Sequence, residues 1–334
     1  MKSKSNTPAF IAILLSMLTL QTATLFAQAQ PAAENETFIH FKSQPGLYRY
    51  KLGNFEITAI SDGTVPQDLH TLLRGSSKTD IDHLLKKAHL ANPVEASINS
   101  YLINTGNKLI LVDTGAGEFF GAGYGGKLVQ RLQSAGYAPS EITDILITHI
   151  HTDHSGGLVN NGQAVFPNAT VHVGKADLDF FLDEKNQNGI KGYDKIYFQQ
   201  ATTALSPYIK LGHIRPISGS KLLFTGVYAT PTPGHTPGHY FYTAESQGKS
   251  ITFIGDSIHV ESVQFPKPEI TITYDVDQPS AAEQRAVQFE KIAKEGRLIA
   301  APHLPYPGIG YIQQDDSGHG YRFIRAEFHD RDGM

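Results

Sequence analysis

The sequence contains no cysteine and no tryptophan among its 334 residues. Because cysteine is absent, the chain has neither a disulfide framework nor a lipid-anchored cysteine. Its fold must depend on the core and on any metal that it binds. An excess of basic residues is also missing, since 28 lysines and arginines face 32 aspartates and glutamates. Nucleic-acid partners require a basic surface, so this charge balance disfavours a nucleic acid as partner or substrate.

An apolar segment near the N-terminus, AFIAILLSMLTL at residues 9–20, has the features of a secretory signal peptide. Lys2 and Lys4 precede it, and an Ala-Gln-Ala motif that ends at Ala29 follows it. A single membrane anchor is the alternative, but Gln21 and two threonines interrupt the run. The run is short of the roughly 20 apolar residues that span a bilayer. We therefore predict cleavage after Ala29 and a periplasmic or secreted protein that is not stably inserted in a membrane.

The mature chain would begin at residue 30 and consist of a short leader and one domain. Cleavage of residues 1–29 removes two lysines and no acid, so 26 basic residues face 32 acidic ones and the net charge becomes −6. Residues 30–44 are predicted to form a flexible leader. Residues 45–334 are predicted to form a single domain, because no linker, repeat or heptad interrupts them.

Strand patterns occur in pairs that predict β-hairpins, at residues 47–60, 100–115 and 240–256. Further strands are expected at the end of 141–150 and at 297–303 and 321–328. Helical patterns lie between the strands, at residues 125–136, 175–184 and 280–296. In the last of these, Ser280 and Glu283 form a predicted capping box and Gly296 ends the helix. Paired strands with helices between them predict an α/β fold of two packed sheets covered by helices.

The stretch THIHTDHSGG, residues 148–157, places three histidines and an aspartate within six positions after a predicted strand. Alternation along an extended backbone directs His149 and His151 to the same side. Asp153 and His154 belong to the turn beyond and can face a second point nearby. Neutral imidazoles and a carboxylate suit borderline divalent metals. A set of surface or capping histidines is the alternative, and the position at a strand end favours the metal site.

Three further strand ends offer additional ligands. His235 lies in the loop TPTPGHTPGH, Asp256 follows the apolar strand of FIGDS, and His303 ends IAAPH. Apolar strands that each end in one ligand-type residue suggest loops gathered at one edge of the sheets.

The order of these motifs resembles the metallo-β-lactamase superfamily. Asp113 in VDTG is the first motif, HIHTDH follows, and His235, Asp256 and His303 complete the series. Within the superfamily the chain is similar to the methyl parathion hydrolase group and its lactonase and arylesterase relatives. That similarity is carried by FEITAISDGT, YLINTGNKLILVDTG, GHTPGH, PGIGYI and GYRFI, and it extends from about residue 45 to 328. The resemblance implies an αββα four-layer sandwich and a metal-dependent hydrolase.

The resemblance also implies a centre with two divalent metals. His149, His151 and His235 would hold one metal, and Asp153, His154 and His303 the other. Asp256 would bridge both metals, and Asp113 would orient ligands from behind. A water between the metals would become the hydroxide nucleophile, and Asp153 would take its proton and pass it to the leaving group. Zinc is favoured, with manganese, cobalt and iron as alternatives.

A substrate pocket is implied in the same way, lined by Leu72, Phe120, Phe181, His259, Ile272 and Tyr274. Aromatic walls favour a flat or apolar substrate, although Phe120 and Phe181 could instead pack in the core. The organophosphate hydrolase of the group carries a tryptophan near Phe181 and small apolar residues near His259 and Tyr274. The larger polar groups of this chain favour a planar ester or lactone over a bulky phosphotriester.

We therefore predict an exported hydrolase of lactones and aryl esters, with acyl-homoserine lactones among its candidate substrates. An organophosphate triesterase is the alternative; a β-lactamase and an inactive metal-binding protein are weaker ones. The chain lacks the cysteine ligand of some β-lactamases, and all seven ligand positions are filled, which argues against an inactive scaffold. The sequence leaves a homodimer open. His172, His213 and His239 are expected in structural or exposed positions, and His239 is also a candidate to support the ligands.

Overall fold

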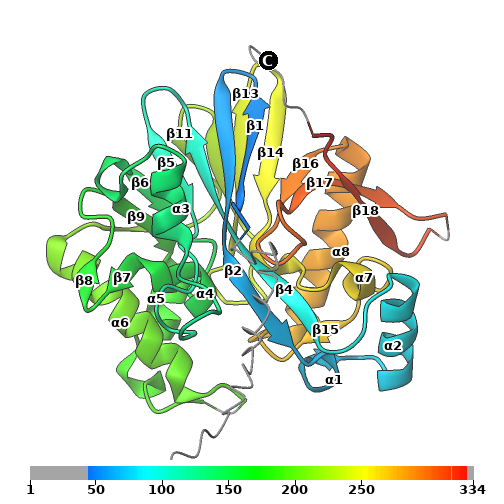
Figure 1. Ribbon diagram of the computed structural model, residues 1–334. Helices are drawn as coiled ribbons and strands as arrows, with labels where there is room; N and C mark the ends of the chain where they lie inside the picture. Colours follow the sequence, from blue (N-terminus) through cyan, green and yellow to red (C-terminus); the bar gives the residue numbers. More distant parts are fainter. Residues whose placement is uncertain (1–43, 191, 317, 329–334) are drawn as a thin grey trace, which may run out of the picture. The chain divides into compact units, whose positions relative to one another are not determined.

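The computed structural model describes residues 44–190, 192–316 and 318–328. The predicted signal peptide and nearly all of the predicted leader lie outside these residues. The described residues from Pro45 onward form one compact unit, built around two seven-stranded sheets (Figure 1). Within the described ranges, no helix is long and apolar enough to cross a membrane.

The first sheet combines an antiparallel half with a parallel half. Its strands, in spatial order, are β1 (Leu47–Leu52), β2 (Phe55–Gln67), β4 (Val94–Asn104), β5 (Leu109–Val112), β6 (Asp144–Leu146), β9 (Thr170–Gly174) and β10 (Ile214–Ile217). Strands β1, β2, β4 and β5 pair antiparallel in that order. Strands β5, β6, β9 and β10 pair parallel. The parallel half requires crossover connections, and these carry the helices on this side of the molecule.

The second sheet is antiparallel except where β14 and β16 run parallel. Its strands are β11 (Lys221–Phe224), β12 (Val227–Pro231), β13 (Tyr240–Ser246), β14 (Lys249–Phe253), β16 (Leu298–Ala300), β17 (Ile309–Gln314) and β18 (Tyr321–Arg325). Two short ribbons lie outside these sheets: β3 (Leu73–Arg74) with β15 (Thr271–Ile272), and β7 (Val159–Asn160) with β8 (Gln163–Ala164).

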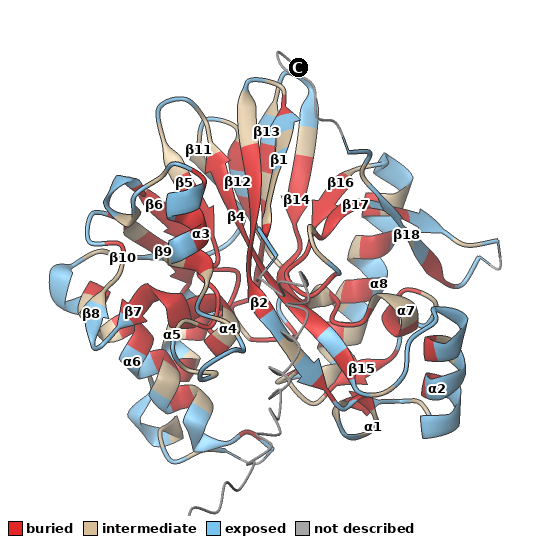
Figure 2. Cartoon of the chain, viewed as in Figure 1, coloured by how far each residue is buried: buried red, intermediate tan, exposed pale blue. Residues whose placement is uncertain are grey.

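The central strands of each sheet are buried on both faces, which explains their nearly continuous apolar character. In β5, Val112 packs between the two sheets against residues such as Phe253, whereas Leu111 packs on the outer face beneath the helices. Figure 2 shows the central strands of both sheets as predominantly buried, whereas edge strands such as β18 are largely exposed. The layers are therefore helix, sheet, sheet and helix, and the predicted αββα sandwich is confirmed.

The helices are α1 (Leu69–Leu72), α2 (Lys78–Lys87), α3 (Leu128–Ser134), α4 (Thr152–Ser155), α5 (Lys175–Phe181), α6 (Lys195–Leu211), α7 (Glu261–Gln264) and α8 (Gln278–Glu295). Four short 3-10 turns are η1 (Pro139–Glu141), η2 (Gly156–Leu158), η3 (Glu184–Asn186) and η4 (Gly255–Ser257). In Figure 1, α3 to α6 lie beside the first sheet, and α8 lies beside β16 and β17. Phe198 of α6 and Phe289 of α8 belong to the two outer cores.

The three predicted hairpins are confirmed. The three predicted helices are also confirmed, as α3, α5 and α8, although their ends differ from the predicted ones. The predicted capping box of the last helix was wrong. That helix begins at Gln278, and the carboxylate of Asp277 accepts the backbone N–H of Ser280, so Asp277 is the N-cap. Gly296 ends the helix in the left-handed conformation, as expected, with φ of 61°.

Candidate metal centre

Four loops that follow strands bring the ligand candidates together. His149 and His151 follow β6, and α4 adds Asp153 and His154; His235 follows β12, Asp256 lies in η4 after β14, and His303 follows β16. These strands belong to both sheets, so the cluster ties the two halves of the sandwich together. Asp153 and His154 were expected in a turn and instead lie on one short helix.

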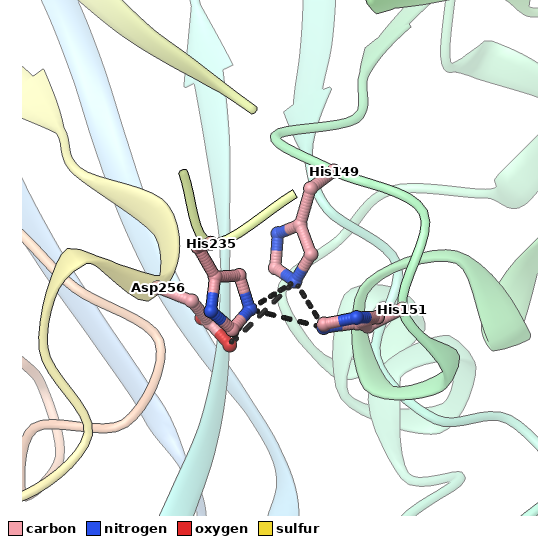
Figure 3. Close-up of side chains that lie close together, drawn as sticks. All are labelled: His149, His151, His235 and Asp256. Carbon is pink, nitrogen blue, oxygen red and sulfur yellow. Dashed lines mark hydrogen bonds and ion pairs between the residues drawn. The ribbon is translucent and has the colours of Figure 1, made fainter. Parts of the chain in front are cut away.

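The first group of ligand atoms is compact and buried (Figure 3). Nε2 of His149 lies 2.9 Å from Nδ1 of His151 and 3.2 Å from Nε2 of His235. Nε2 of His235 lies 3.0 Å from Nδ1 of His151 and 3.3 Å from Oδ2 of Asp256. Figure 3 shows the three rings and the carboxylate directed toward one point.

The second group shares Asp256 with the first. Nε2 of His154 lies 3.2 Å from Oδ1 of Asp256 and 3.7 Å from Oδ1 of Asp153. Nε2 of His303 lies 3.4 Å from Oδ2 of Asp153 and 3.2 Å from Oδ2 of Asp256. The two carboxylate oxygens of Asp256 therefore reach both groups, as expected for a bridging ligand.

The donor atoms fit divalent metals in both groups. Ligands about 2.0–2.1 Å from a tetrahedral zinc ion lie about 3.3 Å from one another, close to the separations seen here. Nε2 of His154 and Oδ1 of Asp256 are buried without a hydrogen-bond partner. Such atoms are costly in a folded protein unless a ligand satisfies them. Burial, reinforced by neighbouring histidines, holds the pKa of His149 and of His151 well below its usual range, which keeps both rings in the neutral form that binds metals.

Groups behind the cluster fix the orientation of its rings. Oδ2 of Asp113 lies 2.9 Å from Nδ1 of His154, and this carboxylate also accepts the backbone N–H and the hydroxyl of Thr148. Oδ1 of Asp275 lies 2.7 Å from Nδ1 of His235. The carbonyl of Ser97 lies 2.8 Å from Nδ1 of His303. Each contact leaves the other ring nitrogen free to face the metal.

Two further groups hold the loops together. Asp177, in α5, accepts the backbone N–H groups of Ile150 and Gly238 and the hydroxyl of Thr236. It thereby joins the loop of His149 and His151 to the loop of His235. The hydroxyl of Tyr193 makes a short hydrogen bond with Nε2 of His151. The sequence interpretation missed Asp177, Tyr193 and Asp275, because nothing in the local pattern links them to ligands far along the chain.

His239 lies within this framework rather than at the surface. Its Nε2 accepts the backbone N–H of Asp256. Gly255, directly before Asp256, has φ of 46°, and a Cβ there would lie 2.4 Å from Nε2 of His239. Only glycine fits this tight approach, which sets the position of the bridging aspartate. His239 is thus one of the groups that support the ligands, as the sequence suggested.

A cavity of about 480 Å³ opens over the cluster. Its lining includes ligand residues of both groups, namely His151, Asp153, Asp256 and His303, together with Val65, Gln67, Leu72, Phe120, Ile196, Tyr197, Gln200 and Tyr274. A larger cavity of about 880 Å³ lies beside α8 and includes none of the seven ligand candidates in its lining. The smaller cavity is therefore the candidate substrate site.

The structure divides the six expected pocket residues into two sets. Leu72, Phe120 and Tyr274 line the cavity over the cluster. Phe181, Ile272 and His259 do not line it and are buried. Phe181 packs in the core beneath the helices, with its ring against that of His151, and Ile272 packs in the small core around α1 and α2. The resemblance that suggested these six residues could not reveal which of them face the cavity in this chain.

The comparisons with known proteins agree with this geometry. The model of the Metallo-beta-lactamase superfamily matches residues 94–303, which is more than half of the chain. The chain therefore belongs to the metallo-beta-lactamase superfamily. It is a metallo-hydrolase of that superfamily, and lactonases are among its relatives.

Two solved structures are similar over most of the chain. The hydrolase AbOPH of the beta-lactamase superfamily has a TM-score of 0.80 at 37% identity, covering 86% of this chain and 100% of its own. AidC, a dizinc quorum-quenching lactonase in complex with the product N-hexanoyl-L-homoserine, has a TM-score of 0.76 at 27% identity, covering 85% and 99%.

Curated relatives match shorter parts of the chain. An N-acyl homoserine lactonase of Bacillus thuringiensis is 27% identical over 188 residues, which cover 50% of this chain and 67% of the lactonase. A ribonuclease of Thermus thermophilus is 24% identical over 248 residues, or 70% of this chain. The chain spans only about half of that ribonuclease, 54% of its length.

Proposed function

We propose that the chain hydrolyses lactones and aryl esters at a centre that holds two divalent metals. The observation that carries this proposal is the cavity of about 480 Å³, because ligand residues of both groups form part of its lining. A substrate in this cavity would have its scissile bond next to Asp153 and the bridging Asp256. The size suits a small organic molecule, since ligand pockets commonly measure about 300–1,000 Å³.

The walls of the cavity favour a flat substrate with an apolar substituent. Leu72, Phe120 and Ile196 supply apolar surface, and Ile196 is itself half exposed at 45%. Tyr197 and Tyr274 supply hydroxyl groups. Burial raises the pKa of both tyrosines, so both remain protonated at neutral pH and can donate a hydrogen bond to a carbonyl or ring oxygen.

In the proposed reaction, the metals would activate water and polarise the substrate, and the side chains would hold the metals and transfer the proton. Two divalent ions would supply an activated water and polarise the carbonyl group under attack. His149, His151 and His235 would hold one ion, Asp153, His154 and His303 the other, and Asp256 would bridge them. Asp153 is the more exposed of the two carboxylates among the ligand candidates, with 18% of its side chain accessible against 3% for Asp256. It is therefore the group best placed to accept a proton from water and to transfer it to the leaving oxygen.

This role of Asp153 can be tested by exchange for the isosteric amide. Asp153→Asn keeps the shape of the side chain but cannot accept the proton, so kcat should fall about 10²- to 10⁴-fold. Metal content must be measured on the same sample. Full turnover by this variant with its metals bound would refute the proton-transfer role.

Acyl-homoserine lactones are the candidate natural substrates that the relatives suggest. AidC was solved with a product of that class, and the relative from Bacillus thuringiensis is an N-acyl homoserine lactonase. Their identity to this chain is 27% in both cases, so the comparison motivates the choice of substrates and the cavity supplies the physical reason.

The decisive experiment compares two sets of substrates on one preparation. Protein reloaded with zinc or manganese is assayed with dihydrocoumarin, phenyl acetate and an acyl-homoserine lactone, and in parallel with methyl parathion and paraoxon. We expect kcat/KM for the best lactone or ester to exceed that for either phosphotriester at least a hundredfold, which corresponds to about 2.7 kcal/mol. Asp256→Ala, which removes the bridging carboxylate, is the inactive control. Faster turnover of a phosphotriester would make the chain an organophosphate hydrolase instead.

We also propose that the protein acts outside the cytoplasm, on the grounds of the predicted signal peptide. N-terminal sequencing of the protein from a periplasmic or culture extract tests this. A mature N-terminus near residue 30 is expected, and an intact Met1 in the cytoplasmic fraction would contradict export.

A further inference from the structure

His259 lies against the metal cluster without a role in either ligand group described above. Its side chain is 1% exposed and it does not line the substrate cavity. Its ring is stacked on that of His303, with centroids 5.2 Å apart and planes inclined by 16°. On the other side it meets the ring of His235, with centroids 5.1 Å apart. His259 is therefore wedged between one ligand of each metal group.

Nδ1 of His259 has no hydrogen-bond partner among the described residues, and Nε2 meets the carboxylate of Asp256 without the geometry of a hydrogen bond. A buried polar atom without a partner is unfavourable, so a ring with an unsatisfied nitrogen in this position is suited to a ligand that is bound there. Nε2 of His259 lies 3.1 Å from Oδ2 of Asp256, and Nε2 of His303 lies 3.2 Å from the same oxygen. These separations match those within the two established groups.

A third possible ligand group consequently consists of Asp256, His259 and His303. Its candidate ligand atoms all lie within 4.8 Å of one another. It shares Asp256 with both of the other groups and His303 with the group of Asp153 and His154. All three of its members are buried, whereas Asp153 is partly exposed and lies 3.4–3.7 Å from its neighbours, the longest separations in its group.

The backbone around His259 is held in a way that fixes the ring. Oε1 of Gln264 accepts the N–H of His259 at 2.7 Å and that of Val260 at 3.1 Å. Gln264 is itself fully buried, and its Nε2 donates to the carbonyl of Ile270. His259 is thus presented to the cluster by a rigid support, as a metal ligand requires.

We propose that His259 is a reserve ligand for the metal held by Asp153, His154 and His303. With the carboxylate of Asp153 displaced or absent, Nε2 of His259 would hold the ion together with Asp256 and His303. This inference rests on the two-metal centre of the proposed function, but it does not depend on which substrate the enzyme hydrolyses.

The test counts metals in a set of four proteins: the wild type, Asp153→Ala, His259→Phe and the double variant. Phenylalanine keeps the ring that stacks on His303 and removes both nitrogens, so the packing is preserved. Each metal-free protein is reloaded with cobalt, freed of excess metal and analysed for bound metal and for its visible absorption spectrum. Circular dichroism and thermal melting establish that each variant is folded.

We expect two metals in the wild type and in each single variant, and one in the double variant. In titrations, the weakening of the second site in the double variant should exceed the product of the two single effects at least tenfold, because the two ligands replace each other. The cobalt spectrum of Asp153→Ala should differ from that of the wild type and should lose intensity when His259→Phe is added.

His213→Phe combined with Asp153→Ala is the matched control. His213 also has a buried ring nitrogen without a partner, but it lies between α6 and β10 and outside all three ligand groups. This double variant should keep two metals.

Three results would overturn the proposal. A single metal in Asp153→Ala would mean that His259 cannot replace the carboxylate. Two metals in the double variant, or purely additive effects, would mean that His259 only packs against Asp256. One metal in the wild type would overturn both the reserve ligand and the two-metal centre, whereas inactivity toward lactones with two metals bound would refute only the proposed substrate.

Discussion

Asp113 and Asp275 each fix one metal-facing histidine from behind. The carboxylate of Asp113 forms hydrogen bonds with Nδ1 of His154 and with the backbone N–H and the hydroxyl of Thr148. The carboxylate of Asp275 forms a hydrogen bond with Nδ1 of His235. Each contact selects the tautomer in which Nε2 is free for the metal. The orientation of these two rings is therefore set by carboxylates that lie outside both ligand groups.

The first prediction follows for Asp113. Its backbone has φ of 56°, a conformation that asparagine tolerates, so Asp113→Asn removes the negative charge with little backbone strain. We expect the affinity of the second metal to fall about 10- to 100-fold, measured by competition with a chelator. Asp179→Asn, at an exposed carboxylate paired with Lys175, is the control. An unchanged affinity in Asp113→Asn would show that Asp113 does not support His154.

At the residue scale, the seven ligand candidates could be picked out from the sequence because each follows an apolar strand or belongs to one short motif, and the structure brings them together. Most of the residues that orient these side chains from behind could not be predicted from the sequence. Asp275 is 40 positions from His235, and Asp177 is 27 positions from Ile150, so only the folded chain brings them together. His259 was expected in the pocket wall and is instead buried against Asp256.

At the scale of elements, α5 connects two metal-binding loops through Asp177. Burial raises the pKa of Asp177 to about 6, although three hydrogen-bond donors partly offset that effect. Asp177→Ala would leave the N–H groups of Ile150 and Gly238 and the hydroxyl of Thr236 without their acceptor.

We therefore expect Asp177→Ala to reduce the free energy of unfolding of the metal-free protein by about 3 kcal/mol or more, since each buried unsatisfied group costs about 1–3 kcal/mol. Urea denaturation measures this difference. Asp179→Ala, in the same helix but exposed, should change it by less than about 0.5 kcal/mol. Equal effects of the two substitutions would contradict the role of Asp177.

The carboxylate of Asp144 joins further elements at a distance from the ligand cluster. Asp144 of β6 meets Nζ of Lys108 at 2.7 Å and Nε2 of His172 of β9 at 2.9 Å, and the ring of His172 contacts Phe224 of the second sheet. Burial alone would raise the pKa of Asp144, but the hydrogen bonds from His172 and Lys108 outweigh it and lower the pKa below 3.8.

A lowered acid pKa stabilises the folded state above the unfolded pKa, and this stabilisation is lost as the pH falls through the folded pKa. We expect Asp144→Asn to reduce the free energy of unfolding by about 1–2 kcal/mol near neutral pH. The difference from the wild type should shrink as the pH falls below 3.8, the unperturbed value. Denaturant titrations of metal-free protein across this range measure it, and a difference independent of pH would contradict the ion pair.

The elements themselves were only partly predictable. The hairpins follow from strict local signals, whereas α6 was missed. Its sequence contains Pro207, which ordinarily breaks a helix, and its 17 residues hold together because Phe198, Leu205 and Tyr208 pack beneath the first sheet. The N-cap of α8 was misplaced by three residues, because Asp277 and Ser280 are both good capping residues and only the backbone path decides between them.

At the scale of the whole molecule, metal binding joins the two sheets. The seven ligand candidates follow strands of both sheets, so an ion bound by them would link the sheets, and the chain has no cysteine with which a disulfide could do the same. A metal that binds the folded state alone stabilises it by about 4 kcal/mol when its free concentration is a thousandfold above Kd.

Removal of metal by a chelator should therefore lower Tm by about ten degrees, and added zinc should restore it. Differential scanning calorimetry with and without zinc measures this shift. In Asp256→Ala, which lacks the carboxylate common to both groups, zinc should shift Tm much less. If neither chelator nor zinc changes the Tm of the wild type, the cluster does not hold metal in the folded protein.

The αββα architecture was predictable because it follows from the order of strands, helices and metal motifs, all of which are local. The boundary of the cavity was not, because it depends on which side of a loop faces the cluster once the sheets have packed. Leu72, Phe120 and Tyr274 face it, whereas Phe181 and Ile272 pack in two separate cores.

The most direct test of the central claim, that two ligand groups joined by Asp256 hold two ions, is anomalous diffraction from crystals of the zinc-loaded protein at the zinc absorption edge. The account predicts two strong peaks, one coordinated by His149, His151 and His235, and one by Asp153, His154 and His303, with Asp256 in contact with both. A single peak, or peaks away from these side chains, would contradict it.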